Sequence, residues 1–377
     1  MIVAHAMLLS SLFRMPHAAH RKPQELEQPM NLLELISDRH RIIAVIGMAK
    51  NAGKTVALNE LIAQASEHAL RLGLTSIGRD GERIDVVTST DKPTIYAAPG
   101  TLLATAEGLF DCSEARLELL EITDYGSPLG RILIARVIGA GNVQLAGPCT
   151  NAGIREVSEK MLAYGARLVL VDGALDRVSS ASPAIADGAV LSTGAVLSRD
   201  MNKVIEQTLH RVRLFQLEQV QDPWIRALSD ELGYAPGVTV IEEEAGCFQR
   251  RDLPILTALS SGKAIAAAMN DTTRYVLISG ALVTKTLSDI VQGTRAYRHT
   301  VFVVRDATRI FIDHRDWMAF RKLGVTVQVA DPVDILAVTV NPYAPTGYFF
   351  EPKRFLEQLR AFLEPVPVFD VVHGGEL

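Results

Sequence analysis

Residues 42–55 read IIAVIGMAKNAGKT, and this stretch decides the fold class that the sequence predicts. Five apolar residues, 42–46, are typical of a short strand that is buried on both faces of a sheet. The glycine-containing segment 47–55 follows, and residues 56–72 then carry apolar side chains at helical spacing up to Gly73, a suitable helix C-cap. A strand, a glycine loop and a helix in this order predict an α/β domain with a mostly parallel sheet.

The segment 47–55 has the composition of a loop that binds phosphate. Gly53 allows the backbone to curl so that successive N–H groups point at a phosphate, and the following helix adds its positive N-terminal dipole. Lys54 would reach the β- and γ-phosphates of a bound nucleotide, and the Thr55 hydroxyl would ligate Mg²⁺. ATP and Mg²⁺ are therefore the predicted cofactors. The other predicted nucleotide contacts are Gly47, Asn51, Ala52 and Val56.

A carboxylate follows a second apolar strand more than a hundred residues downstream. Residues 168–171 read LVLV and lead directly into Asp172, at the strand end where open parallel sheets place their ligands. Asp172 there would organise Mg²⁺ through water. Asp80, in a charged turn after the strand predicted at 74–77, is a further candidate for the metal or a substrate, although a solvated turn explains it equally. Lys50 is a candidate catalytic lysine inside the loop, or an exposed surface lysine.

The rest of the chain predicts two α/β units and an N-terminal tail. Residues 1–29 read as a disordered tail or an over-long gene start, residues 30–216 as a phosphate-loop (P-loop) domain, and residues 217–377 as a second α/β domain for docking or substrate. A hairpin is expected at 117–122 and 131–138, inside the first unit. The strands expected in the second unit are 238–241, 275–279, 301–304, 325–329 and 335–340.

Composition excludes several classes of function. A net charge of −5 gives no general attraction to nucleic acid or to an anionic membrane. Three widely spaced cysteines form neither a disulfide framework nor a zinc pattern, and no apolar run approaches the roughly 20 residues that span a bilayer. We therefore expect a cytoplasmic protein with neither nucleic-acid nor membrane partners.

The two motifs together resemble the dethiobiotin synthetase branch of P-loop proteins. Five residues separate Gly47 from Gly53, one more than in the common pattern, and this longer loop occurs in that branch. The triplet Asp172-Gly173-Ala174 matches the acidic-Gly-Ala triplet of those proteins and of cobyrinate amidotransferases. The loop acid of the synthetase is replaced by Ala49, its catalytic lysine has no counterpart, and no glutaminase motif is present, so the chemistry of that branch does not transfer.

A second resemblance covers the loop and residues 171–210, which are similar to a reactivase component family encoded beside adenosylcobalamin-dependent aminomutases. That resemblance implies an aminomutase, or a companion ATPase subunit related to mismatch-repair proteins, as the partner. Homodimers are common among relatives. In the larger class of dimeric P-loop proteins a signature lysine of the loop reaches phosphates in the neighbouring subunit. Lys50 could do the same, although its position within the loop differs from that of the signature lysine. The segment around Asp187 and Thr193-Gly194 could line the site, or be ordinary loop.

Three functions remain open from the sequence. The first is an Mg²⁺-dependent ATPase switch that acts on a partner protein, in which nucleotide binding favours one conformation. The second is an ATP-dependent ligase or kinase that activates a small carboxylate or hydroxyl. The third is a nucleotide-binding protein with weak or lost hydrolysis. The missing lysine and glutaminase motif favour the first.

Overall fold

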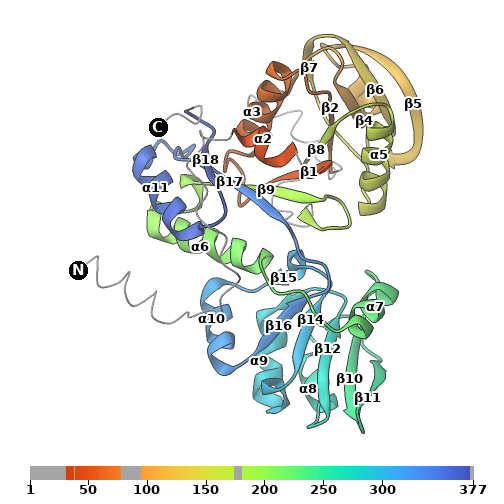
Figure 1. Cartoon of the computed structure of the whole chain (residues 1–377), viewed down its shortest axis with the longest axis vertical. Coiled ribbons are helices and arrows are strands. Elements are labelled where there is room, and N and C mark those ends of the chain that lie inside the picture. The colour runs from red at the N-terminus through yellow and green to blue at the C-terminus, as the bar shows by residue number, and fades with distance from the viewer. Residues whose placement is uncertain (1–30, 38, 78–94, 174–180, 374–377) are drawn as a thin grey trace. The chain divides into compact units, whose positions relative to one another are not determined.

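The computed structural model describes residues 31–37, 39–77, 95–173 and 181–373. Strands in this part form a nine-stranded sheet, a five-stranded sheet and two short two-stranded ladders, with helices packed on the sheets (Figure 1). The predicted α/β class is therefore confirmed, with large mixed sheets in which parallel pairs predominate. The N-terminal tail predicted at residues 1–29 lies outside the described residues.

The nine-stranded sheet carries the 42–47 strand near its middle. Its six parallel pairings run from β18 to β4, and the hairpin β6–β5 closes one edge in antiparallel fashion. In spatial order the strands are β18 (Val368–Asp370), β17 (Ile335–Asn341), β9 (Gly188–Gly194), β1 (Ile42–Gly47), β8 (Leu168–Asp172), β2 (Leu72–Ser76), β4 (Leu102–Ala106), β6 (Gly130–Gly139) and β5 (Arg116–Ser127).

Helices cover both faces of this sheet because successive residues of its central strands point to opposite sides. Ile43 and Val45 of β1 share one buried cluster with α2 (Leu32–Ser37) and α3 (Lys54–Glu67). Ile42, Ala44 and Ile46 join the opposite cluster. That cluster includes side chains of α5 (Asn151–Ala163), α6 (Met201–Phe215) and α11 (Pro352–Leu363). The continuous apolar run that predicted β1 therefore reflects burial on both sides.

The five-stranded sheet follows α6 in the chain. Its order is β11 (Cys247–Leu253), β10 (Val238–Glu244), β12 (Thr273–Ile278), β14 (Val301–Val304) and β16 (Thr326–Val329). β12, β14 and β16 are parallel, whereas β10 and β11 are antiparallel. One face packs on α7 (Pro223–Leu232) and the other on α8 (Gly262–Ala268), α9 (Thr284–Gly293) and α10 (His314–Leu323), as Figure 1 shows.

Small elements complete the described chain. The ladders are β3 (Ile95–Ala97) with β7 (Gly141–Val143), and β13 (Leu282–Val283) with β15 (Ile310–Phe311). A short helix, α4 (Glu107–Phe110), follows β4, and 3₁₀ turns lie at Ala195–Leu197, Ala296–Arg298 and Ala307–Arg309. Among the described helices, none has both the length and the apolar character needed to cross a bilayer.

The structure corrects the expected membership of one strand. We predicted the strand at 335–340 as part of the second unit, but β17 pairs in parallel with β9 and belongs to the nine-stranded sheet, as does β18 after it. Periodicity shows that a segment is a buried strand, whereas the sheet that it joins depends on pairing with residues far away in the chain. The predicted hairpin is confirmed as β5–β6, and 238–241, 275–279, 301–304 and 325–329 lie in the five-stranded sheet.

Candidate functional site

The loop between β1 and α3 lies at the carboxyl edge of the nine-stranded sheet. β1 is flanked by β8 and β9, and its carboxyl end is continuous with the loop. The next strand of this sheet after β1 is β2, beyond β8, whereas the next strand of this sheet after β9 is β17, on the opposite side. Strand order thus reverses between β1 and β9, and such switch points are where open parallel sheets bind ligands.

Gly53 precedes α3 in a conformation that L-residues rarely adopt. Its φ is +100° and its ψ is 7°, in the left-handed region, and Asn51 also has a positive φ, of 65°. A Cβ atom on Gly53 would lie 2.9 Å from the Cβ atom of Asn341 at the end of β17. Glycine is therefore required here both by the backbone and by the close approach of another strand.

Lys54 and Asp172 meet at the ends of neighbouring strands. β1 and β8 are parallel with Val45 opposite Asp172, so this carboxylate emerges beside the loop. The Lys54 Nζ atom lies 2.7 Å from Asp172 Oδ1 and also donates to the Gly173 carbonyl. The two side chains are 12% and 24% exposed, so the ion pair is partly shielded from solvent. The sequence placed these residues in one site, and the fold brings them into contact.

No side chain among the described residues caps the N-terminus of α3, although it is a helix of 14 residues. Several other helices are capped: side chains of Thr150, Asp200, Asp222, Asp313 and Glu351 accept hydrogen bonds from the first turns of α5, α6, α7, α10 and α11. The first N–H groups of a helix have no partner within it, and together with the helix dipole they attract an anion. The start of α3 therefore has the electrostatics of an anion site.

Asn341 is a site residue that the sequence reasoning missed. Its Nδ2 atom donates to the Asn51 carbonyl across 3.3 Å, and its Oδ1 atom accepts from the Tyr343 N–H at 3.1 Å. The carbonyl of Asn341 approaches the neighbouring β9, because a Cβ atom on Gly194 would lie 2.4 Å from that oxygen. The sequence signal for this residue is Asn-Pro directly after an apolar strand, but apolar periodicity alone does not show that this strand joins the sheet of the loop.

Exposed aromatic rings follow Asn341. The centroids of the Tyr343 and Phe349 rings are 6.0 Å apart, and these side chains are 43% and 64% exposed. The Tyr343 hydroxyl lies 3.1 Å from His373 Nε2, and His373 Nδ1 lies 2.9 Å from the buried Asp370 carboxylate. Because Asn341 contacts the loop, this chain of contacts places an aromatic surface on the segment that borders it.

The remaining loop candidates differ in their surroundings. Ala52 is buried, Thr55 is half-buried in the first turn of α3, and Lys50 and Val56 are exposed. Lys50 forms no ion pair with any residue that the structure describes. Asp80 and Ala174, which completes the acidic-Gly-Ala triplet, lie outside the described residues.

Asp187 lies at the opposite edge of the sheet from the loop. Its Oδ2 atom accepts from the N–H groups of Arg41 and Ile42, where β1 begins, and its Oδ1 atom pairs with Arg155 at 2.7 Å. Burial raises the pKa of Asp187, but these hydrogen bonds outweigh burial and hold the pKa below its usual value. Asp187 thus anchors the start of β1, whereas Thr193-Gly194 lie at the carboxyl end of β9 beside the site.

Ligands for a metal are few at the loop. In the described ranges no three His, Cys, Asp or Glu side chains gather closely enough to hold an ion. One carboxylate and one hydroxyl, Asp172 and Thr55, suit Mg²⁺, which keeps several waters and takes phosphate oxygens as further ligands.

Comparison with models of known families, with curated proteins and with solved structures gives no match.

Proposed function

We propose that this protein binds Mg²⁺-ATP at the loop 47–55 and acts as an ATPase switch on a partner protein. The observation that carries the proposal is the meeting of Lys54 and Asp172 beside the uncapped start of α3. A lysine, a carboxylate and a cluster of outward-facing N–H groups form the donor set that a magnesium-bound triphosphate requires.

The ion pair fits a site that exchanges one cation for another. Without nucleotide, the Lys54 ammonium neutralises the partly shielded Asp172 carboxylate at 2.7 Å. In the nucleotide complex Lys54 would turn to the phosphates, and Asp172 and Thr55 would hold Mg²⁺, which would supply neutralisation of phosphate charge. Both states keep the carboxylate paired, and this avoids the large free-energy cost of an isolated buried charge.

The aromatic segment suits the base of the nucleotide. Tyr343 and Phe349 expose ring faces on the segment that contacts the loop through Asn341. Stacking on such rings contributes about 1–3 kcal/mol per base and discriminates weakly between bases. We therefore infer a nucleotide site whose affinity depends chiefly on phosphate contacts, with the rings as secondary support.

A buried polar contact favours a nucleotide switch that acts at a distance over a nucleotide site with local effects alone. The Ser182 hydroxyl donates to the carboxylate of the fully buried Asp306 at 2.8 Å. Ser182 follows Gly173 by nine residues in the sequence. Asp306 directly follows Arg305 after β14, and its carboxylate also accepts from the Tyr234 hydroxyl at 3.3 Å. In the proposed switch, a displacement of Ser182 would be felt at Asp306, which follows β14 of the five-stranded sheet. Chains of hydrogen-bonded and packed groups of this kind are what carries coupling between sites in proteins.

The first test is nucleotide binding by Lys54→Ala. Loss of charge-assisted hydrogen bonds, each contributing about 1.5–3 kcal/mol, should weaken Mg²⁺-ATP binding roughly 10- to 100-fold or more in isothermal titration. Lys263→Ala is the matched control, because Lys263 is also a lysine that follows a glycine in the first turn of a helix and is exposed. Equal ATP affinity in wild type and Lys54→Ala, with both chains folded, would refute the site.

The second test separates the switch from a small-molecule enzyme. ATP turnover is measured for the purified chain alone, with a candidate adenosylcobalamin-dependent aminomutase, and with small carboxylates or amines. The switch predicts turnover that rises with the partner protein, and exchange of damaged cobalamin that requires ATP. Turnover that needs no partner and follows a small acid or amine would establish the ligase or kinase alternative instead.

A further inference from the structure

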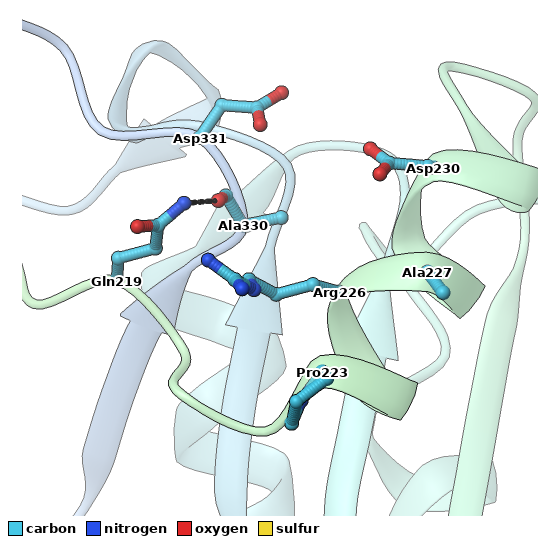
Figure 2. A pocket seen from close by; sticks show the side chains of 7 residues that line it. All are labelled: Gln219, Pro223, Arg226, Ala227, Asp230, Ala330 and Asp331. Carbon is cyan, nitrogen blue, oxygen red and sulfur yellow. Dashed lines mark hydrogen bonds between the residues drawn. The ribbon is translucent and has the colours of Figure 1, made fainter.

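A hollow of about 300 Å³ opens at the carboxyl edge of the five-stranded sheet (Figure 2). One wall is the start of α7 and the other is the segment after β16. Its volume is at the lower end of the range for small-molecule sites, about 300–1,000 Å³, and it lies where parallel strands present ligands. The lining residues are Gln219, Pro223, Arg226, Ala227, Asp230, Ala330 and Asp331.

The hollow contains an arginine whose side chain is not engaged by the described residues. The Arg226 guanidinium makes neither an ion pair nor a hydrogen bond with any residue in the described part of the chain. Figure 2 shows its side chain extending from α7 toward Ala330, across the space between the two walls. An exposed guanidinium with its donors unused is suited to a planar carboxylate, which it can bind through two parallel hydrogen bonds.

Acceptors face the hollow from both walls. Asp230 lies on α7 and Asp331 follows β16, and in Figure 2 both carboxylates lie on the same side of Arg226. Arg305, whose side chain is only 14% exposed, holds them through ion pairs of 2.9 Å and 2.5 Å. Gln219 donates its Nε2 to the Ala330 carbonyl at 2.8 Å, and this bond ties the segment before α7 to the segment after β16.

One cation shared between two carboxylates leaves acceptor capacity unused. Arg305 also donates to the Ser229 carbonyl at 2.8 Å, so its donors are divided among several oxygens. Burial raises the pKa of Asp331 above its ordinary value, although Arg305 acts in the opposite direction. A second positive group beside Asp331 would stabilise its ionised form. The hollow is thus electrostatically suited to a ligand with an ammonium at one end and a carboxylate at the other.

We propose that this hollow binds a free α-amino acid, with its carboxylate on Arg226 and its ammonium near Asp331 and Asp230. Phosphate is disfavoured because the two aspartates would repel it. A simple amine would leave Arg226 unmatched, and a simple carboxylate would leave the acceptors unmatched. The site is built from α7 and the five-stranded sheet, so it does not depend on nucleotide binding at the loop.

The test is a binding screen with the full chain and no nucleotide. Each common α-amino acid, in both enantiomeric forms, is added at about 10 mM, and a ligand well above its Kd should raise Tm by about 1–3 °C. Isothermal titration of the strongest hit is then compared with its decarboxylated amine, its deaminated acid and inorganic phosphate. We expect each single-charge analogue to bind at least about 10-fold more weakly, because one charge-assisted contact is lost.

Two variants locate the site. Arg226→Gln should weaken binding of the same amino acid roughly 10- to 100-fold, whereas Arg321→Gln, an exposed arginine in the last turn of α10, should leave it unchanged. Asp230→Asn removes the charge of a side chain that is 67% exposed. This substitution should weaken binding of the amino acid but not binding of its deaminated acid. Binding of no amino acid, tighter binding of phosphate, or equal affinity in Arg226→Gln would each overturn the proposal.

Discussion

Replacing Gly53 with alanine tests how the loop is built, independently of any ligand. Two separate effects act at this residue. The backbone lies at φ +100°, in the left-handed region, and a Cβ atom would lie 2.9 Å from the Asn341 Cβ atom. Real Cβ atoms do not approach so closely, so β17 or the start of α3 must move.

The expected destabilisation follows from adding these effects. An L-residue in the left-handed region costs about 1–2 kcal/mol. Forcing an extra carbon into a packed contact costs typically 1–3 kcal/mol. The free energy of unfolding of Gly53→Ala should therefore fall by about 2–5 kcal/mol, a large part of the ~5–15 kcal/mol typical of native proteins.

Gly324→Ala supplies the matched control. Gly324 ends α10 at φ 92° and ψ 17°, nearly the dihedral angles of Gly53, but a Cβ atom there meets nothing within 4 Å. Urea unfolding followed by circular dichroism should give a loss of about 1–2 kcal/mol for Gly324→Ala, which is the dihedral effect alone. The difference between the two variants then measures the contact with Asn341.

A double-mutant cycle identifies the contact itself. In an Asn341→Gly background the opposing Cβ atom is gone, so Gly53→Ala should cost about as much as Gly324→Ala. In an Asn341→Ala background the Cβ atom remains, and the full effect should persist. Equal losses for Gly53→Ala and Gly324→Ala in the wild-type background would refute the close approach of β17 to the loop.

Two further predictions concern pH and stability. Asp187 has a depressed pKa in the folded chain. Its contribution to stability is therefore fully present above the unfolded pKa of about 3.9 and is lost as pH falls through the folded pKa. Asp187→Asn should lower the free energy of unfolding by roughly 1 kcal/mol at neutral pH, and urea midpoints measured at neutral and at acid pH should show a smaller difference from wild type in acid. Burial lowers the pKa of His210, whose Nε2 atom donates to the Ile312 carbonyl at 2.8 Å. As pH falls, this histidine therefore takes up a proton in the unfolded chain before it does so in the folded chain. The free energy of unfolding should decrease as pH falls from about 7 to 5. His210→Gln should flatten that decrease, whereas the exposed His299→Gln should not; an unchanged slope in His210→Gln would contradict this account.

Residues that are adjacent in the chain were enough to predict the local part of the site. A buried strand, a glycine loop and a helix start follow from residues that are adjacent in the chain, so β1 and α3 form with Gly53 before the helix and Lys54 and Thr55 in its first turn. The pairing with Asp172 could also be anticipated, because a carboxylate directly after a buried parallel strand must emerge at the same sheet edge as the loop. Both inferences rest on short-range pattern and on the geometry common to all parallel sheets.

The distant segments that complete the site could not be predicted, because long-range strand pairing selects them. Whether the strand 335–341 joins one sheet or the other depends on its pairing with β9, and apolar periodicity is the same in both cases. That pairing brings Asn341 against Gly53 and places Tyr343 and Phe349 on the bordering segment. The hollow beside Arg226 likewise joins residues about a hundred positions apart, Gln219 and Ala330, through long-range packing that no local spacing encodes.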